Sequence, residues 1–205
     1  MSDGHLRSGT QASDQVFSDE DWYGDDLSGR SFARCRFVDC DLTEATSTGA
    51  VFEACEFVGC RFNSSTHRST VFARCLFRRT SFFGATLAGC KLVGSTFTAC
   101  TLRPLTVEGG DWSYVSLERS NLAGVDLAGV RLEESDLSGA DLSKACFRGA
   151  RMSRCVLSGA TLNDADLVGA DLSGVDLRGL QWRRTKLDPL QLLLLAEQLG
   201  IDVTD

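Results

Sequence analysis

Large apolar residues return at every fifth position along most of this chain. Between Ser120 and Leu177 the series is unbroken, and it starts with Leu122, Leu127 and Leu132. The residue two places before each of these is small, and the residue immediately before it is often Asp or Asn. A period of five fits neither the 3.6 of an α-helix nor the 2 of a flat strand. The pattern is therefore an internal repeat.

The same frame runs from Phe17 to Leu187 without an insertion or a deletion. Of its 35 positions, only Ser47 and His67 do not hold a large apolar residue. A side chain that points inward every five residues requires a corner every five residues, and four corners close a square. One coil then takes about twenty residues, and with roughly 4.8 Å between coils, about eight coils make a rod about 40 Å long. We expect an all-β solenoid, a quadrilateral β-helix.

Stacking at twenty-residue intervals sorts the interior side chains into columns. One column predicts an aromatic stack in the amino-terminal half that gives way to a leucine stack in the carboxy-terminal half. Its members are Phe17, Phe37, Phe57, Phe77, Phe97, Leu117, Leu137, Leu157 and Leu177.

The two exceptions to the frame, Ser47 and His67, lie twenty residues apart and therefore share a column. A metal-binding or catalytic role for His67 lacks partners, because no Asp or Glu lies between Phe57 and Val107. We expect a packing irregularity or a hydrogen-bonded inward pair, and His67→Leu should leave activity intact. The other histidine, His5, is expected to be a solvated side chain.

The two ends of the chain fall outside the repeat. Asp188 followed by Pro189 is a typical helix opening, and Gly200 is a typical helix stop. The pattern divides the chain into residues 1–14 as a flexible amino-terminal tail, residues 15–187 as the β-helix, and residues 188–205 as a carboxy-terminal helix and tail.

The carboxy-terminal helix carries more leucine than one contact surface needs. Gln191 and Gln198 fall on one narrow stripe at 100° per residue, and apolar faces lie on either side of it. One face suffices to cover the last coil, so the other favours an isologous homodimer joined end to end. The alternative is that both faces fold back on the rod. The candidate dimerisation residues are Leu190, Leu192, Leu193, Leu194, Leu195 and Leu199.

Charge is distributed unevenly along the chain, whose formal net charge is −7. Residues 1–56 carry a net charge of −8, residues 57–107 carry seven bases and no acid, and residues 108–176 carry −6. The acidic total disfavours free nucleic acid or an anionic membrane as the partner and suits a basic one. The basic segment either binds an acidic patch on that partner or neutralises the amino-terminal acids. With no apolar run long enough to span a bilayer, we expect a soluble cytoplasmic protein.

The nine cysteines behave as small fillers of the interior. Eight stand two places before an inward residue, where Ala, Ser, Thr and Val also occur, and Cys146 alone is at an outward position. No C-x2-C spacing of a zinc site is present, and in a reducing compartment thiols are expected. The eight are Cys35, Cys40, Cys55, Cys60, Cys75, Cys90, Cys100 and Cys155.

The motifs of common enzyme classes are missing from the sequence. It contains no phosphate-binding G-x-x-x-x-G-K-[ST], no H-E-x-x-H and no G-x-S-x-G. The carboxylates are expected on a convex surface, where nothing shifts their pKa values for acid–base work. We predict a protein that is not an enzyme and needs no cofactor or metal.

The repeat resembles the pentapeptide-repeat family, whose consensus A-[D/N]-L-x-x stands here at Ala140–Leu142, Ala165–Leu167 and Ala170–Leu172. The resemblance implies a right-handed quadrilateral β-helix. The segment Phe97–Leu105, the segment Thr66–Arg68, the uninterrupted frame and the carboxy-terminal helix further resemble the MfpA and Qnr branch of that family. The long surface loops of Qnr proteins are absent here, and Pro104 should alter its corner because proline lacks an N–H.

Members of that branch are dimeric DNA mimics that bind DNA gyrase and alter its inhibition by quinolones. The resemblance implies the same partner, a type II topoisomerase, for the acidic carboxy-terminal half of this chain. The alternatives are a structural scaffold for another protein and an immunity factor against a gyrase-targeting natural product. The candidate gyrase-binding carboxylates are Glu118, Asp126, Glu133, Glu134, Asp136, Asp141, Asp166, Asp171 and Asp176.

Overall fold

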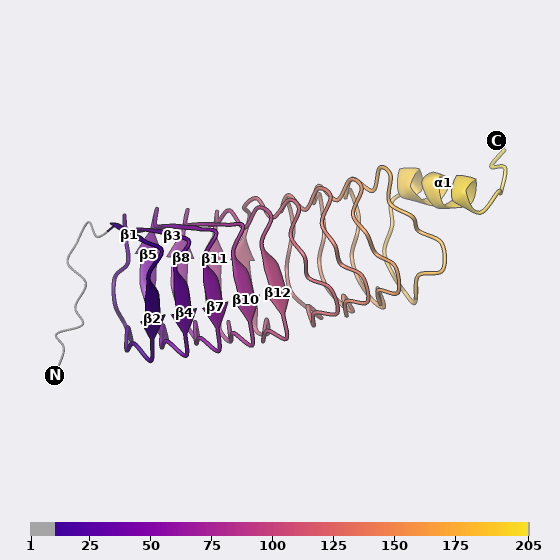
Figure 1. Cartoon of the computed structure of the whole chain (residues 1–205). Helices are drawn as coiled ribbons and strands as arrows, with labels where there is room; N and C mark the ends of the chain where they lie inside the picture. The colour runs from indigo at the N-terminus through magenta and orange to yellow at the C-terminus, as the bar shows by residue number, and fades with distance from the viewer. Residues whose placement is uncertain (1–10, 205) are drawn as a thin grey trace.

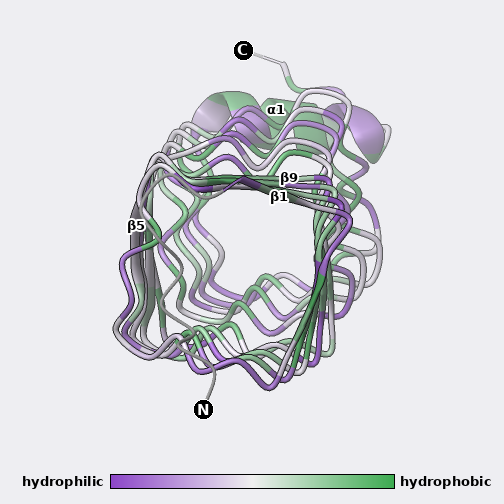
Figure 2. Cartoon of the chain, turned by 60° about the vertical axis from the view of Figure 1, so that its left-hand side comes forward, coloured by the Kyte–Doolittle hydropathy of each residue, from purple (hydrophilic) through white to green (hydrophobic). Residues whose placement is uncertain are grey.

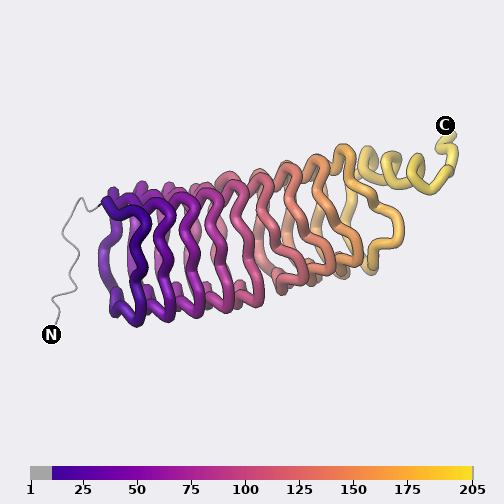
Figure 3. The backbone as a smooth tube through the Cα atoms, viewed as in Figure 1, coloured from indigo at the N-terminus to yellow at the C-terminus, as the bar shows by residue number. Residues whose placement is uncertain are grey.

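The chain winds into a right-handed quadrilateral β-helix, as the repeat predicts. The computed structural model describes residues 11–204. Its coils stack into a rod, shown from the side in Figure 1 and Figure 3, and enclose a square section in Figure 2. Most sides of a coil pair in parallel with the side twenty residues later, from Gln11↔Ser31 to Asp166↔Lys186. The expected fold class is confirmed.

Four faces follow one another along each coil and repeat every twenty residues. Face A includes residues 21–25, face B 26–30, face C 31–35 and face D 36–40. Three faces carry named strands in the amino-terminal half, and face A and the later coils are held by isolated bridges.

The strands on each face are three or four residues long. Face C holds β1 (Gln11–Ser13), β3 (Ser31–Ala33), β6 (Val51–Glu53) and β9 (Val71–Ala73). Face D holds β2 (Val16–Ser18), β4 (Arg36–Val38), β7 (Glu56–Val58), β10 (Leu76–Arg78) and β12 (Thr96–Thr98). Face B holds β5 (Thr46–Thr48), β8 (Thr66–Arg68), β11 (Ala85–Ala88) and β13 (Leu105–Glu108).

The solenoid begins earlier than the sequence predicts. Ala12 is buried in β1, and Asp14 N–H donates to Ala33 O at 3.0 Å. The expected tail of residues 1–14 is therefore wrong for residues 11–14; residues 1–10 and His5 lie outside the described residues. The frame missed this side because a small alanine occupies its inward position.

Aspartate before the inward residue favours an isolated bridge over a strand. Asp136 Oδ1, for example, accepts from Ser138 N–H at 2.9 Å, two residues on, which tightens the side into a turn. Strands form instead on sides that open with residues such as Val51 or Thr46, whose β-branched side chains suit extended backbone.

The interior follows the predicted columns. Phe37 stacks on Phe57 with ring centroids 4.6 Å apart, and Phe77 on Phe97 at 4.7 Å. The predicted aromatic stack is confirmed, and Leu117 continues the column in the buried core.

Small inward residues also tie successive coils together by hydrogen bonds. Cys60 Sγ donates to Phe37 O at 3.4 Å and Thr80 Oγ1 to Phe57 O at 3.2 Å, both 23 residues back along the chain. Burial raises the pKa of the Cys90 thiol to about 11, so this thiol is protonated and able to donate at neutral pH. Cysteine, threonine and serine are thus interchangeable here in chemistry as well as size.

The carboxy-terminal helix α1 (Pro189–Gln198) lies over the last coil and completes its backbone bonding. Asp188 and Gln191 form a reciprocal capping box at its start. Gln191 Nε2 donates to Ala170 O at 2.8 Å, and Gln198 Nε2 donates to Val175 O at 2.7 Å. In earlier coils, the corresponding carbonyl accepts a hydrogen bond from the backbone N–H that lies 21 residues later in the chain. Ala150 O, for example, accepts from Asp171 N–H. The glutamine amides therefore replace the missing next coil.

We predict that removing these amides destabilises the rod. Gln191→Leu or Gln198→Leu should each lower the free energy of unfolding by about 1–3 kcal/mol, because carbonyls of the last coil lose their donors. Urea denaturation followed by circular dichroism measures the change. The exposed Gln181→Leu is the matched control and should stay near wild type; equal stability of all three variants would contradict the capping role.

Candidate interaction surface

The nine candidate carboxylates are distributed over all four faces of the carboxy-terminal half. The rod therefore presents them around its circumference, not as one column. Face A carries Asp141; face B carries Asp126 and Asp166; face C carries Glu133, Glu134 and Asp171; face D carries Glu118, Asp136 and Asp176.

Each of the six candidate aspartates uses one carboxylate oxygen to hold its own turn. Asp126 Oδ1 accepts from Ala128 N–H at 2.9 Å, and Asp141 Oδ1 accepts from Ser143 N–H at 3.0 Å. This local bond explains why Asp or Asn recurs at these positions. In Asp126, Asp136, Asp141 and Asp171 the other oxygen has no cation bound to it within residues 11–204, whereas in Asp166 and Asp176 it accepts from Arg or Lys.

Four of the nine carboxylates are paired with a nearby cation. Glu118 pairs with Arg119, and Glu134 pairs with Arg154 at 3.2 Å. Asp166 lies 3.0 Å from Arg148 and 3.3 Å from Lys186. These pairs are solvent-exposed on at least one side, so they reduce the local negative charge more than they stabilise the fold.

The fourth pair, Asp176 with Arg178, is local in sequence. Hydrogen bonds from the Arg178 side chain and backbone hold the pKa of Asp176 at about 2. The pKa of Asp171 is also lowered, by hydrogen bonds from the Ser173 hydroxyl and N–H. Asp176 is therefore ionised but neutralised, whereas Asp171 is ionised with no cation bound to it among residues 11–204.

Five candidates have no ion pair within the part of the chain that the structure describes. They occupy every face, so the unpaired negative charge surrounds the rod as phosphates surround a duplex. They are Asp126, Glu133, Asp136, Asp141 and Asp171.

The basic segment mostly neutralises the acids beside it. Arg61 pairs with Asp41 at 2.8 Å, and Arg74 pairs with Glu53. Of the seven bases between residues 57 and 107, four contact a carboxylate of a flanking segment. The pairs are Arg61–Asp41, Arg68–Glu108, Arg74–Glu53 and Arg78–Glu56. Of the two readings of this segment, the structure favours neutralisation.

The leucines of α1 do not divide as the helical wheel predicted. Gln191 and Gln198 face the rod, and Leu194 and Leu195 pack against the core on either side of them. The expectation that one leucine face covers the last coil is therefore wrong, because buried carbonyls there require amide donors. Four candidates remain exposed: Leu190, Leu192, Leu193 and Leu199.

The inward pair expected at Ser47 and His67 is confirmed. Ser47 Oγ lies 2.6 Å from His67 Nδ1 and 2.7 Å from Thr70 Oγ1, and His67 Nε2 lies 3.0 Å from Ser65 Oγ. Ser65 Oγ donates to Phe62 O, which leaves it to accept from Nε2–H and fixes a neutral imidazole. Burial lowers the pKa of His67 to about 4. All partners are satisfied internally, so the network is structural.

Sites of other chemistry are not apparent in the described chain. All nine cysteines, which lie within residues 11–204, are unpaired, and Cys146 is half-buried on face B. Over the same residues no group of His, Cys, Asp and Glu is placed to hold a metal ion. No described helix has the length and apolar character needed to cross a bilayer.

The sequence reading missed the glutamine cap. Its signal was present, since Gln191 and Gln198 are seven residues apart on one face of a helix that follows the last coil. Asp188 adds a third contact, because its Oδ2 accepts from Gly169 N–H at 2.9 Å.

The coil period, the inward columns and the capped turns are those of one family. Its sequence profile, described as "Pentapeptide repeats", matches residues 31–66, 68–103, 113–154 and 148–179, more than half of the chain. The chain belongs to the pentapeptide-repeat family. That match indicates no catalytic family, and no curated protein sequence matches this pentapeptide-repeat protein.

Solved structures similar to this pentapeptide-repeat protein include QnrB1, described as a plasmid-mediated fluoroquinolone resistance protein. A trypsin-treated variant of QnrB1 is 24% identical, with 96% of this chain and 98% of that chain covered and a TM-score of 0.65. Full-length QnrB1 is 23% identical, with 94% and 100% covered and a TM-score of 0.53. The likeness shows a shared fold over the length of both chains.

We predict that His67 makes stability depend on pH. The unfolded chain binds a proton near pH 6.5 but the folded chain only near pH 4. The stabilisation is therefore complete above pH 6.5 and is lost as pH falls toward 4, by about 2 kcal/mol between pH 7 and pH 5. Urea denaturation at both pH values measures it. His67→Gln, which does not titrate, should lack this component; an unchanged pH dependence in that variant would contradict the assignment.

Proposed function

We propose that this pentapeptide-repeat protein binds DNA gyrase, a type II topoisomerase, by presenting DNA-like carboxylates from a homodimeric rod. The observation that carries the proposal is the ring of unpaired carboxylates around the carboxy-terminal half. Residues 108–176 carry a net charge of −6 over about 17 Å of rod, about one charge per 3 Å. Duplex DNA carries about one per 1.7 Å of axis, so the charge density is of similar order.

The dimer supplies the symmetry that the partner requires. The helix α1 lies at the end of the rod opposite β1 (Figure 1), and its exposed leucines form an apolar surface that a partner would cover. Joining two rods end to end through α1 places both acidic halves at the centre, as a surface roughly 30–40 Å long. That surface fits a two-fold basic saddle that holds DNA.

The outcome of binding is competition with DNA, seen as inhibited supercoiling, or protection of gyrase from quinolone-type poisons. Fold likeness to a fluoroquinolone resistance protein supports the second outcome. The proposal places the protein in the cytoplasm with no cofactor. A scaffold role and an immunity role against a gyrase-targeting natural product are the rivals, and the gyrase assays below distinguish them.

We predict that Leu193→Arg gives a monomer. Leu193 is 45% exposed, so arginine there disturbs the fold little but places two charges in the proposed interface. Light scattering of wild type, Leu193→Arg and the control Glu197→Arg, an exposed polar position on the same helix, measures the mass. Wild type and the control should be dimers; a dimeric Leu193→Arg protein would count against this interface.

We predict that neutralising the unpaired aspartates abolishes the effect on gyrase. Replacing Asp126, Asp136, Asp141 and Asp171 by Asn keeps each Oδ1 acceptor and so keeps each turn, while removing four charges. Inhibition of supercoiling, or protection from a quinolone, should weaken by roughly tenfold or more. A supercoiling assay with titrated dimer measures both.

The matched control removes four charges from the amino-terminal half and should keep its potency. If the variant with the four carboxy-terminal aspartates replaced acts on gyrase as potently as wild type, the DNA-mimic mechanism is contradicted. Wild-type protein that neither inhibits nor protects at micromolar concentration would favour the scaffold, and protection from a natural-product poison alone would favour the immunity factor. The control substitutions are Asp19→Asn, Asp21→Asn, Asp26→Asn and Asp39→Asn.

A further inference from the structure

The backbone ladder between coils is interrupted on two adjacent faces at the level of the rod that contains Pro104. A shorter gap, on face D alone, lies between residues 155–159 and residues 175–179. On faces A and B, no backbone hydrogen bond joins the two coils at the Pro104 level of the described chain. The bridges expected between Thr101 and Asn121 and between Thr106 and Asp126 are missing as well. We call this two-face gap the seam; it lies between residues 101–109 and residues 121–129.

The same two coils are fully joined on the other two faces. On face C, Trp112 N–H donates to Arg131 O at 2.7 Å, and on face D, Leu117 N–H donates to Asp136 O at 2.8 Å. The interface is therefore open on one side of the rod and closed on the opposite side.

The next interface shows that the interruption is local. On face A, Asp141 N–H donates to Ser120 O at 3.0 Å, and Leu122 N–H donates to Asp141 O at 2.9 Å. On face B, Cys146 N–H donates to Val125 O at 3.1 Å. All four faces are joined there, so the repeat itself permits a closed ladder.

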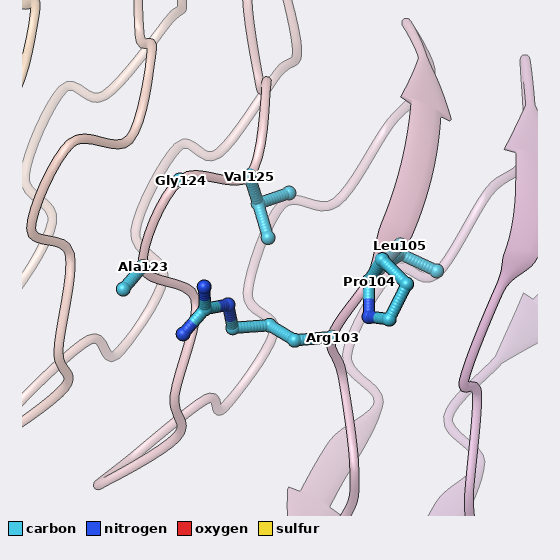
Figure 4. Close-up of a pocket in the computed structure, with 6 residues that line it drawn as sticks. All are labelled: Arg103, Pro104, Leu105, Ala123, Gly124 and Val125. Atoms are coloured by element: carbon cyan, nitrogen blue, oxygen red, sulfur yellow. The ribbon is translucent and has the colours of Figure 1, made fainter.

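The seam is a real hollow in the surface. Pro104 removes one donor from its edge because it has no N–H. Arg103 reaches across toward the facing turn and donates to Asn121 Oδ1 at 3.2 Å. Figure 4 shows the hollow, whose volume is about 410 Å³; a second of about 480 Å³ continues it along Thr96–Cys100. The lining residues in Figure 4 are Arg103, Pro104, Leu105, Ala123, Gly124 and Val125.

A buried indole behind the seam lacks a partner. Trp112 lies on face C of one of the two coils that border the seam, and it is 1% exposed. Its Nε1 is buried and makes no hydrogen bond within the described residues. An indole N–H in the interior normally has an acceptor. Water that enters through the seam would supply one.

We propose that the seam is a hinge of the rod. The two halves bend relative to each other by widening or narrowing faces A and B, while the continuous ladder on faces C and D acts as the pivot. Bending at an interface that is joined on all four faces breaks backbone bonds between coils, whereas bending at the seam breaks none. Water fills the open side, satisfies the unpaired backbone groups of both edges and reaches Trp112.

Distances between spin labels test the hinge directly. Pairs of cysteines eighty residues apart, at outward positions of one column, span four coils, or about 19 Å before the label arms. Cys100 and Cys146 are first replaced by Ser, and labelled protein is diluted with unlabelled protein to remove contacts between protomers. The three pairs are Ser81/Thr161 across the seam on face A, Val71/Arg151 across the same interface on face C, and Asp21/Thr101 across intact interfaces on face A.

A hinge at the seam requires the Ser81/Thr161 distribution to be clearly broader than both others. The Val71/Arg151 pair crosses the pivot and should stay narrow, and Asp21/Thr101 should match it. Equal widths in all three pairs would overturn the hinge. Equal breadth in the two face A pairs would also overturn it, since flexibility would then not depend on the seam.

Quenching of tryptophan fluorescence is an independent test that needs no labels. Trp22 and Trp112 are both 1% exposed, so a static rod protects them equally. Single-tryptophan proteins are made by changing the other two of Trp22, Trp112 and Trp182 to Phe. Acrylamide should quench the Trp112 protein several-fold more strongly than the Trp22 protein; equal quenching would contradict an opening seam.

Discussion

The parallel hydrogen-bond ladder between coils is the interaction on which every other feature depends. No coil can satisfy its own backbone, because the partners of each side lie twenty residues away in both directions. In an intact interface, three bonds on each face join neighbouring coils, as between residues 120–139 and 140–159. The inward leucines and phenylalanines keep the coils in register, and the glutamines of α1 end the ladder where the coils end.

Sequence alone predicts the features that depend on inward side chains better than those that depend on backbone hydrogen bonds. The coil period, the four columns and the stack from Phe17 to Phe97 follow from side chains that must point inward, so the five-residue frame reveals them. The five-residue frame does not reveal the seam. Leu102 and Leu122 continue the frame, although no backbone hydrogen bonds join the two coils on that face of the described chain. The start at Ala12 was missed because a small residue fills a position that elsewhere holds a large one.

Candidate surface residues are harder to predict because pairing crosses coils. Asp166 and Asp126 occupy the same column of face B and read alike in sequence, yet Arg148 and Lys186 neutralise only Asp166. The partners lie 18 and 20 residues away, at distances set by the coil period and by the rotamers of long side chains. Sequence identifies the acidic half; the structure identifies which of its carboxylates keep their charge.

The glutamine cap has a consequence for assembly. A solenoid whose last coil presented bare carbonyls and N–H groups would be a template for another strand edge, and rods could then add end to end into fibres. The side chains of Gln191, Gln198 and Asp188 form hydrogen bonds with those backbone groups. A side chain offers no new strand edge, so no further coil can pair there. The same three residues that finish the fold therefore give the rod a fixed length, and they leave any joining of two rods to the leucines outside.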